Sequence, residues 1–432
     1  MELRQIFQSL IAMHQAEIPY DLLVRKKSIP TDTEDIVTVS GVRRCGKSSL
    51  LSLAANTLVN QGVAKERILM IGFDDERFSE MEISQMDEIL QAYREMYPFQ
   101  PLKDVYMFFD EIQLIKGWEL FVMRVYKNYC KHIFITGSTS QMLSAEMASA
   151  LRGWPIEINA APLSFAEYLS FNAASPNPYT EEGVAQLKAL FLDYCIEGGF
   201  PQVVLAKGQS EKTRILQNYF NTMLFRDMIE HYEIKTQPSV VRYFLKRVMN
   251  NLTKPTSINS IYNDIKSQGY KVSKDALYSW IEYACNIFLF YAVPCYSKSL
   301  VKETASQSKY YVCDHGLCNA VLLPQSEDQG KHLENIVFRT IMRDLSSEDR
   351  IFYYKETGEC DFVVQRGGKV TDLIQVCWHL SPDNIDREVN GLVLAAKATS
   401  CTNCKIITFD QTQTIERDGL QISVIPIWHK GL

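Results

Sequence analysis

Short apolar runs alternate with longer amphipathic stretches in the N-terminal part of the chain. The stretches between the runs have helix length, and one of them, SSLLSLAANTLVNQG, ends at Gly62. Fully apolar strands that alternate with helices are typical of a parallel sheet covered on both faces. The pattern therefore predicts one α/β domain over residues 1–162. Its strands are expected at residues 35–40, 67–73, 105–109, 132–136 and 156–159.

The pattern changes after Pro162. Residues 163–235 are mostly helix-like, with a break at the sequence GGFP, and predict an all-helical appendage. Residues 236–300 hold helix-like segments followed by the strand-like run FLFYAVPCYS, an order that resembles a winged helix. Residues 301–432 hold a long helix followed by short apolar strands, which predicts a second α/β unit.

Composition adds limits to this picture. The chain has 432 residues, 46% of them hydrophobic, and a formal net charge of −6. Such a chain is globular, and its acidity argues against a protein that coats nucleic acid with its whole surface. The longest nearly unbroken apolar stretch, Ile287–Cys295, is far shorter than the ~20 residues that cross a bilayer. The start does not resemble a secretory signal and the 11 cysteines are scattered, so we expect a cytoplasmic protein without membrane contact.

The sequence GVRRCGKS at residues 41–48 fits the phosphate-loop pattern G-x-x-x-x-G-K-[ST] without a mismatch. It lies between an apolar strand and a helix, as phosphate binding at a helix N-terminus requires. The glycines let backbone N–H groups approach phosphate oxygens, Lys47 would reach the β- and γ-phosphates, and the Ser48 hydroxyl would bind Mg²⁺. The expected nucleotide contacts are Gly41, Arg43, Arg44, Cys45, Gly46, Lys47, Ser48 and Ser49.

Candidate catalytic residues follow later strands. Asp110 ends the apolar run VYMFF and would hold Mg²⁺, directly or through water, while Glu111 would polarise the attacking water as a general base. An acidic pair after a strand is also common as a plain solvated strand end. Ser138, in HIFITGSTSQML, is either a sensor of the γ-phosphate or a capping residue. Arg152 is either a finger that stabilises transition-state charge in a neighbouring subunit or a surface arginine.

Several segments spread over nearly the whole chain carry a family resemblance. In their order along the chain they resemble the bacterial and archaeal AAA-superfamily ATPases that carry a DUF4143-type C-terminal domain. The segments are GVRRCGKSSLL, VYMFFDEIQ, ITGSTSQML, LRGWPIEINAAPLSFAEYL, IEGGFPQVV, LFRDMIEHYEI, YVCDHGLCNAV, HLENIVFRTI, GECDFVV and LIQVCW.

The resemblance implies an α/β fold with a parallel-sheet nucleotide-binding core, a winged-helix segment and a C-terminal domain similar to restriction-endonuclease-like nucleases. It favours ATP with Mg²⁺ as the ligand. It also implies that Ser138 is a sensor and lends weight to Arg152 as a finger. Such enzymes commonly act as oligomers because a neighbour supplies that arginine, so a homo-oligomer is a further hypothesis. Family members often read LRGR where this chain has LRGW, so the second arginine is absent.

Restriction-endonuclease-like sites use carboxylates at the ends of adjacent strands to bind Mg²⁺, and a lysine to align or activate water. The matching positions here are Glu334, Asp361, Gln375 and Cys377. Gln375 stands where the pattern has a glutamate, and Cys377 stands where it has the lysine. Because an amide is a weaker ligand for a hard cation and a cysteine cannot replace an ammonium, we expect a retained fold whose cleavage is lost or severely weakened.

The segment 243–278 is rich in lysine and tyrosine. A winged helix places one helix in the major groove, with Lys and Arg on the phosphates, and SKDALYSWIEYACN would be that helix. Acidic residues dilute the charge, and winged helices are also common protein-interaction modules, so DNA contact is one of two hypotheses. The basic residues are Lys246, Arg247, Lys254, Lys266, Lys271 and Lys274, and the tyrosines are Tyr262, Tyr270 and Tyr278.

Three functions compete at this point. The phosphate loop favours a P-loop ATPase that hydrolyses Mg-ATP and couples its nucleotide state to motion of the winged-helix and nuclease-like domains. The second hypothesis is a nucleotide-gated DNA-binding or adaptor protein with little turnover. The third is an active Mg²⁺-dependent nuclease, which the substitutions at Gln375 and Cys377 disfavour.

Overall fold

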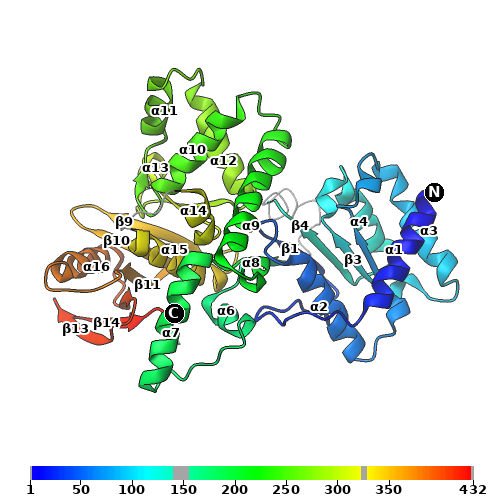
Figure 1. Ribbon diagram of the computed structural model, residues 1–432, viewed down its shortest axis with the longest axis horizontal. Coiled ribbons are helices and arrows are strands. Elements are labelled where there is room, and N and C mark those ends of the chain that lie inside the picture. Colours follow the sequence, from blue (N-terminus) through cyan, green and yellow to red (C-terminus); the bar gives the residue numbers. More distant parts are fainter. Residues whose placement is uncertain (1, 140–154, 323–327, 430–432) are drawn as a thin grey trace. The chain divides into compact units, whose positions relative to one another are not determined.

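The computed structural model describes residues 2–139, 155–322 and 328–429 (Figure 1). The chain divides into two compact units. The N-terminal unit contains Met1–Ala161 together with Asn286–Phe288, and the C-terminal unit contains Pro162–Cys285 and Leu289–Leu432. None of the helices in the described ranges is long and apolar enough to cross a membrane.

A five-stranded parallel sheet forms the centre of the N-terminal unit. The strands lie in the order β2-β3-β4-β1-β5. β1 and β4 are buried along their whole length, as expected for central strands covered on both faces. The predicted parallel α/β core is therefore confirmed. The strands are β1 (Ile36–Ser40), β2 (Ile68–Gly72), β3 (Tyr106–Asp110), β4 (Ile133–Gly137) and β5 (Pro155–Asn159).

Helices pack on this sheet, and the loops that carry the candidate site lie at the carboxyl ends of its strands. Helices α1, α3 and α4 bury apolar residues in one cluster with β2, β3 and β4. Because β3, β4 and β1 are parallel neighbours, the loops at their carboxyl ends lie side by side. These loops carry Glu111, Ser138 and the phosphate loop. The helices of the unit are α1 (Leu3–Glu17), α2 (Lys47–Asn60), α3 (Asp87–Met96) and α4 (Trp118–Asn128).

The C-terminal unit begins with a helical stretch. The Ser164 side chain caps α6 and forms a capping box with Glu167. Helix α7 ends before Gly198, whose φ of 78° is in the region that favours glycine, and α8 begins three residues later. The elements are α6 (Phe165–Phe171), α7 (Glu181–Glu197), α8 (Pro201–Leu205), α9 (Gln209–Thr222) and the π-helix η7 (Met223–Glu230).

A small antiparallel sheet of three strands follows, in the order β6-β8-β7. The elements in chain order are α10 (Pro238–Asn250), β6 (Pro255–Thr256), α11 (Ile258–Ser267), α12 (Lys274–Asn286), β7 (Phe290–Val293), α13 (Leu300–Ala305) and β8 (Ser308–Val312). β8 lies beyond residue 300, so its pairing crosses the domain limit expected there. The sequence did not predict this pairing, because a polar connection separates β7 from β8 and strand pairing depends on distance in space and not on distance in sequence.

The last part of the chain forms a six-stranded mixed sheet with the order β13-β14-β12-β11-β10-β9. β9, β10 and β11 are antiparallel, and α16 connects β11 to its parallel neighbour β12. β14 then adds parallel to β12. The elements are α14 (His315–Val321), α15 (Asp328–Arg343), β9 (Arg350–Lys355), β10 (Glu359–Arg366), β11 (Lys369–Val376), α16 (Ile385–Thr399), β12 (Cys404–Thr408), β13 (Gln413–Arg417) and β14 (Leu420–Pro426).

One hydrophobic cluster joins the segments of the C-terminal unit. Phe191 of α7, Tyr311 of β8 and Phe362 of β10 all belong to it. The rings of Tyr311 and Phe362 lie 5.5 Å apart, and the ring of Phe191 lies 5.9 Å from that of Phe409. The domain limits expected at residues 235 and 300 pass through this shared core. They stay predictions.

Truncation of Phe191 should destabilise the whole C-terminal unit. Phe191 is 0% exposed, so Phe191→Ala is expected to lower the free energy of unfolding by about 3–5 kcal/mol in denaturant titrations. The neighbouring Leu192 is 39% exposed and Leu192→Ala is the matched control, with a change of about 0.5 kcal/mol. If the C-terminal sheet of the Phe191 variant unfolded at the wild-type midpoint, the shared core would not be cooperative.

Candidate functional site

The phosphate loop makes a tight turn between β1 and α2. Gly46 has a φ of 99°, in a region that favours glycine. At Gly41 a side chain is excluded, because a Cβ there would lie 2.0 Å from the carbonyl oxygen of Ala160. Both glycines of the motif are therefore needed for the shape of the loop. Arg44, which also has a positive φ, is exposed.

Lys47 starts α2 and is only 4% exposed. Its Nζ donates to the carbonyl oxygens of Gly41 and Val42 at 3.1 and 3.4 Å, and lies 3.2 Å from Oε1 of Glu111. A buried ammonium at the N-terminus of a helix favours an anion next to it. The geometry suits the phosphate tail of a nucleotide.

The two expected magnesium ligands are in contact with each other. Asp110, at the end of β3, accepts hydrogen bonds from the hydroxyls of Ser48 and Thr136. Burial raises the pKa of Asp110 above its ordinary value, although both hydroxyls oppose this shift. Carboxylate and hydroxyl oxygens are hard ligands of the kind that Mg²⁺ prefers. The donor set at this position therefore fits Mg²⁺.

Glu111 is held in a fixed orientation beside Lys47. Its N–H donates to Oγ1 of Thr136 at 2.9 Å, and its Oε2 accepts from Nε2 of Gln113 at 2.5 Å. Burial raises the pKa of Glu111, but the Lys47 ammonium and the Gln113 hydrogen bond outweigh burial and leave the pKa below its ordinary value. The carboxylate is therefore ionised, as a general base must be before it accepts a proton.

Gln113 also joins Glu111 to Ser138, a link that the sequence analysis missed. Its Nε2 lies 3.3 Å from Oγ of Ser138, and its Oε1 is buried without a partner in the described part of the chain. The only sequence signal was its place two residues after Glu111. The structure thus brings Lys47, Ser48, Asp110, Glu111 and Ser138 together. Arg152 lies outside the described residues.

Two stretches of the chain match known protein families. Residues 33–169 match an AAA domain family, and residues 188–328 match a domain of unknown function, DUF8612. The archaeal protein MJ1544 of Methanocaldococcus jannaschii, described as uncharacterized, is 31% identical over 407 residues, which cover 92% of this chain and 88% of that protein. The chain belongs to the same family as MJ1544. An uncharacterized protein of Haemophilus influenzae is 28% identical over 398 residues, 92% of this chain and 94% of that protein.

The family differs from the expected one in its second domain. The DUF8612 match takes the place of the expected DUF4143 domain, and it extends across the limits expected at residues 235 and 300. Solved structures are more distant. The ORC1 protein of Aeropyrum pernix in complex with DNA has 12% identity and a TM-score of 0.31, with 74% of this chain and 92% of that chain covered. AMPPCP-bound DnaA of Aquifex aeolicus has 16% identity and a TM-score of 0.25, with 56% and 74% covered.

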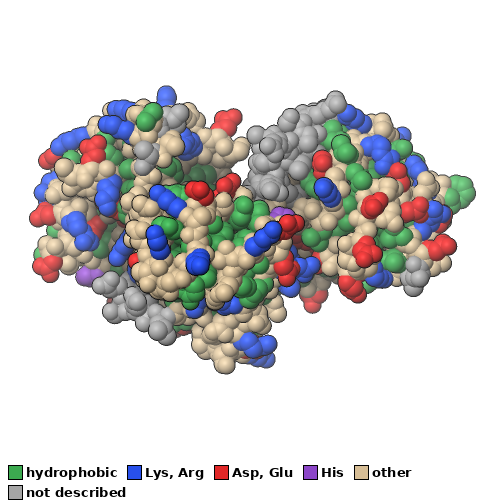
Figure 2. All heavy atoms as spheres, turned by 90° about the horizontal axis from the view of Figure 1, so that it is seen from above, with side chains coloured by type: hydrophobic (Ala, Val, Ile, Leu, Met, Phe, Trp, Pro, Cys, Tyr) green, Lys and Arg blue, Asp and Glu red, His purple; other side chains and the backbone are tan. Residues whose placement is uncertain are grey.

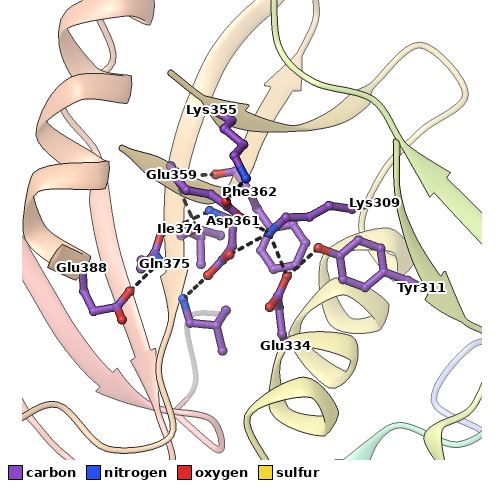
Figure 3. Close-up of polar contacts among 12 residues, drawn as sticks. Lys309, Tyr311, Glu334, Lys355, Glu359, Asp361, Phe362, Ile374, Gln375 and Glu388 are labelled. Carbon is purple, nitrogen blue, oxygen red and sulfur yellow. Dashed lines mark hydrogen bonds and ion pairs between the residues drawn. The ribbon is translucent and has the colours of Figure 1, made fainter. Parts of the chain in front are cut away.

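A second polar site lies in the C-terminal unit (Figure 3). Glu334 of α15 and Asp361 of β10 lie close together there, as expected from the sequence. Both contact Lys309, a residue that the sequence analysis did not single out. Nζ of Lys309, from β8, lies 2.9 Å from Oδ1 of Asp361, 3.3 Å from Oε1 of Glu334 and 2.8 Å from Oε1 of Glu359. Lys309 is only 1% exposed. Its ammonium lies between three carboxyl groups.

Gln375 and Cys377, the two departures from the restriction-endonuclease-like pattern, have different surroundings. Gln375 joins the cluster: its Oε1 accepts from the N–H of Asp361 at 3.1 Å, and its Nε2 donates to Glu388 at 2.6 Å. Cys377 instead donates to the carbonyl oxygen of His379 at 3.1 Å. Burial raises the pKa of the Cys377 thiol to about 11, so it is uncharged at neutral pH. The cation of this site is therefore Lys309.

The cluster opens into a cleft of about 1010 Å³ that Glu334, Glu359, Asp361 and Gln375 help to line. Cations stand around it, but Lys355, Arg387 and Lys397 are paired with Glu359, Glu388 and Asp418. Within residues 2–139, 155–322 and 328–429, no group of three or more His, Cys, Asp or Glu side chains has a geometry that could hold a metal ion. Lys309 therefore supplies the positive charge next to these acidic side chains.

The stability of the protein should depend on the protonation of Glu334. Burial, and secondly the charge of Asp361, raise the pKa of Glu334 from its usual 4.5 to about 8. Lys309 and Tyr311 face it from β8, and Glu359 and Asp361 belong to β10. Between these two pH values the folded state keeps a proton that the unfolded state loses, so rising pH favours unfolding.

We predict that Glu334→Gln flattens this fall of stability between pH 4.5 and about 8, measured as the urea midpoint at several pH values. Glu348→Gln, at an exposed glutamate, is the control and should keep the wild-type slope. An identical pH dependence in wild type and Glu334→Gln would show that Glu334 is ionised throughout this range.

Proposed function

We propose that the protein is a P-loop ATPase that binds Mg-ATP at residues 41–49 and hydrolyses it. The observation that carries this proposal is the convergence of Lys47 and Glu111, 3.2 Å apart, beside the Ser48–Asp110 pair. In this assignment Lys47 binds the β- and γ-phosphates, and backbone N–H groups of residues 41–49 surround them. Ser48 and Asp110 hold Mg²⁺, which supplies positive charge to the phosphate oxygens when it is bound.

Phosphate binding would also release the general base. Lys47 neutralises Glu111 in the structure, and an incoming γ-phosphate competes for the same ammonium. With that ion pair weakened, the pKa of Glu111 rises toward the range in which a carboxylate accepts a proton from water. Gln113 keeps the carboxylate in place, and Ser138 is a sensor on the other side of Gln113. Arg152 is assigned as a finger for a neighbouring subunit in a homo-oligomer.

Two substitutions separate binding from hydrolysis. Lys47→Ala should abolish turnover and weaken Mg-ATP binding, because it removes the buried ammonium. Glu111→Gln keeps the shape of the side chain, so it should preserve binding in calorimetry while the hydrolysis rate falls by about 100-fold or more. Lys127→Ala, at an exposed position of α4, is the control. A Lys47→Ala variant with the wild-type rate would refute the assignment.

We also propose that the C-terminal unit moves as one rigid body when the nucleotide state changes. Its helical, winged-helix-like and sheet segments share a core, so separate motion of each would expose apolar surface. The ATPase cycle is therefore proposed to act on this unit as a whole. The order α10-β6-α11-α12-β7-α13-β8 and its three-stranded antiparallel sheet support a winged helix, with α13 as an additional short helix between β7 and β8.

DNA contact through this winged helix is the second candidate function. Lys266, Lys271 and Lys274 are exposed around the turn between α11 and α12, close in sequence to the exposed Tyr270 and Tyr278. Arg247 pairs with Asp264 at 2.5 Å and so contributes less charge. On the face in Figure 2, blue Lys and Arg side chains lie scattered among red Asp and Glu side chains. A nucleotide-gated DNA-binding or adaptor protein would show salt-dependent DNA binding with little turnover.

We also propose that the C-terminal sheet does not cleave nucleic acid. A metal ion at Asp361 and Glu334 would have to displace an ammonium that contacts both carboxylates. Plasmid incubated with Mg²⁺ or Mn²⁺ should therefore stay intact. Cleavage by the wild type that Asp361→Asn abolishes would instead show an active nuclease, with Lys309 in the place of the missing lysine.

A further inference from the structure

The phosphate loop contacts the segment at which the chain first passes from the N-terminal unit to the C-terminal unit. The N–H of Ala160 donates to the carbonyl oxygen of Ser40 at 2.7 Å, directly before the loop. The carbonyl oxygen of Ala160 then lies against Gly41 and accepts from Sγ of Cys45 at 3.4 Å. The loop thus touches this segment at Gly41 and at Cys45.

Arg25 closes this arrangement. It is 8% exposed, and its two terminal nitrogens donate to different carbonyls: Nη1 to Cys45 at 2.9 Å and Nη2 to Ala161 at 2.9 Å. A planar guanidinium holds two acceptors in a fixed relation, which a lysine cannot reproduce. Arg25 therefore joins the phosphate loop to Ala161, the residue after which the chain first passes into the C-terminal unit.

The next residues of the chain are anchored in the C-terminal unit. Arg343, at the end of α15, donates to the carbonyl oxygen of Pro162 and pairs with Glu167 at 3.3 Å. The N–H of Leu163 donates to Gly199 at 2.6 Å, and the carbonyl oxygen of Leu163 accepts from Tyr194 at 2.8 Å. The carbonyls of Ala161 and Pro162 are thus held by different arginines, one in each unit.

Little rotational freedom remains between these two carbonyls. The peptide bond that joins Ala161 to Pro162 is planar, and the proline ring fixes φ of Pro162. Only ψ of Pro162 can rotate one carbonyl relative to the other. A displacement of the Ala161 carbonyl is therefore passed on to Pro162 and Leu163.

Phosphate binding would displace the loop. Lys47 donates to the carbonyls of Gly41 and Val42, and phosphate oxygens would compete for this ammonium. We infer that Arg25 is a positioning residue that transmits the nucleotide state of the loop to the C-terminal unit through Ala161 and Pro162, with Arg343 as the second anchor. This inference rests on the proposed nucleotide site and adds how that site controls the rest of the chain.

Hydrogen exchange in the full-length chain tests the inference. Exchange at the Leu163 amide is compared with and without Mg²⁺ and a non-hydrolysable ATP analogue, and binding is measured separately by calorimetry. In the wild type the analogue should change this exchange rate by about threefold or more. Arg25→Met should still bind the analogue, about tenfold more weakly, but should lose the exchange response. Arg25→Lys should restore part of it, and Lys26→Met, an exposed neighbour, should respond like the wild type.

Arg343→Met keeps the inference testable if Arg25→Met does not fold. It leaves the loop untouched, so its affinity for the analogue should match that of the wild type while the response at Leu163 disappears. A full response in Arg25→Met or in Arg343→Met overturns the inference. A wild type that binds the analogue without any response overturns it as well and leaves the proposed function intact. A wild type that binds no nucleotide overturns both.

Discussion

The burial of the Lys47 ammonium is the constraint on which the N-terminal unit depends. Removal of a cation from water is costly unless nearby groups compensate it. Lys47 has two neutral carbonyls and one carboxylate as partners, and it lies at the start of a helix. This environment compensates one charge and still favours a further anion. The surrounding features, from the glycines of the loop to the position of Glu111, hold the ammonium in this state.

The charge of the second buried lysine, Lys309, is compensated in a different way. Lys309 lies within 3.3 Å of the carboxyl groups of Glu334, Glu359 and Asp361, so the protein itself compensates its charge. Comparison of the two lysines explains why they receive different roles. Lys47 is proposed to bind an external anion, whereas Lys309 joins β8 to α15 and β10 through ion pairs.

The shared core changes how motion in this protein is understood. Periodicity predicted four domains, and this division stays a prediction; α7, from the second of them, and β8 and β10, from the fourth, contribute to one hydrophobic cluster. In the proposed ATPase cycle a nucleotide-driven change would therefore act on the C-terminal unit as a whole. The chain passes between the two units after Ala161, after Cys285 and after Phe288. At the first of these crossings Arg25 donates to the carbonyl oxygen of Ala161 and Arg343 donates to that of Pro162.

The sequence by itself determined the features that are contiguous. The phosphate loop, the acidic pair after β3 and the alternation of apolar strands with helices all lie within short stretches, so local patterns were enough to predict them. Only the tertiary structure decided the partners of buried charges. Lys309 meets Asp361 across 52 positions of sequence, and Arg25 meets Ala161 across 136. Such pairs leave no periodic signal, because they depend on how strands and helices pack and on where a buried charge finds compensation.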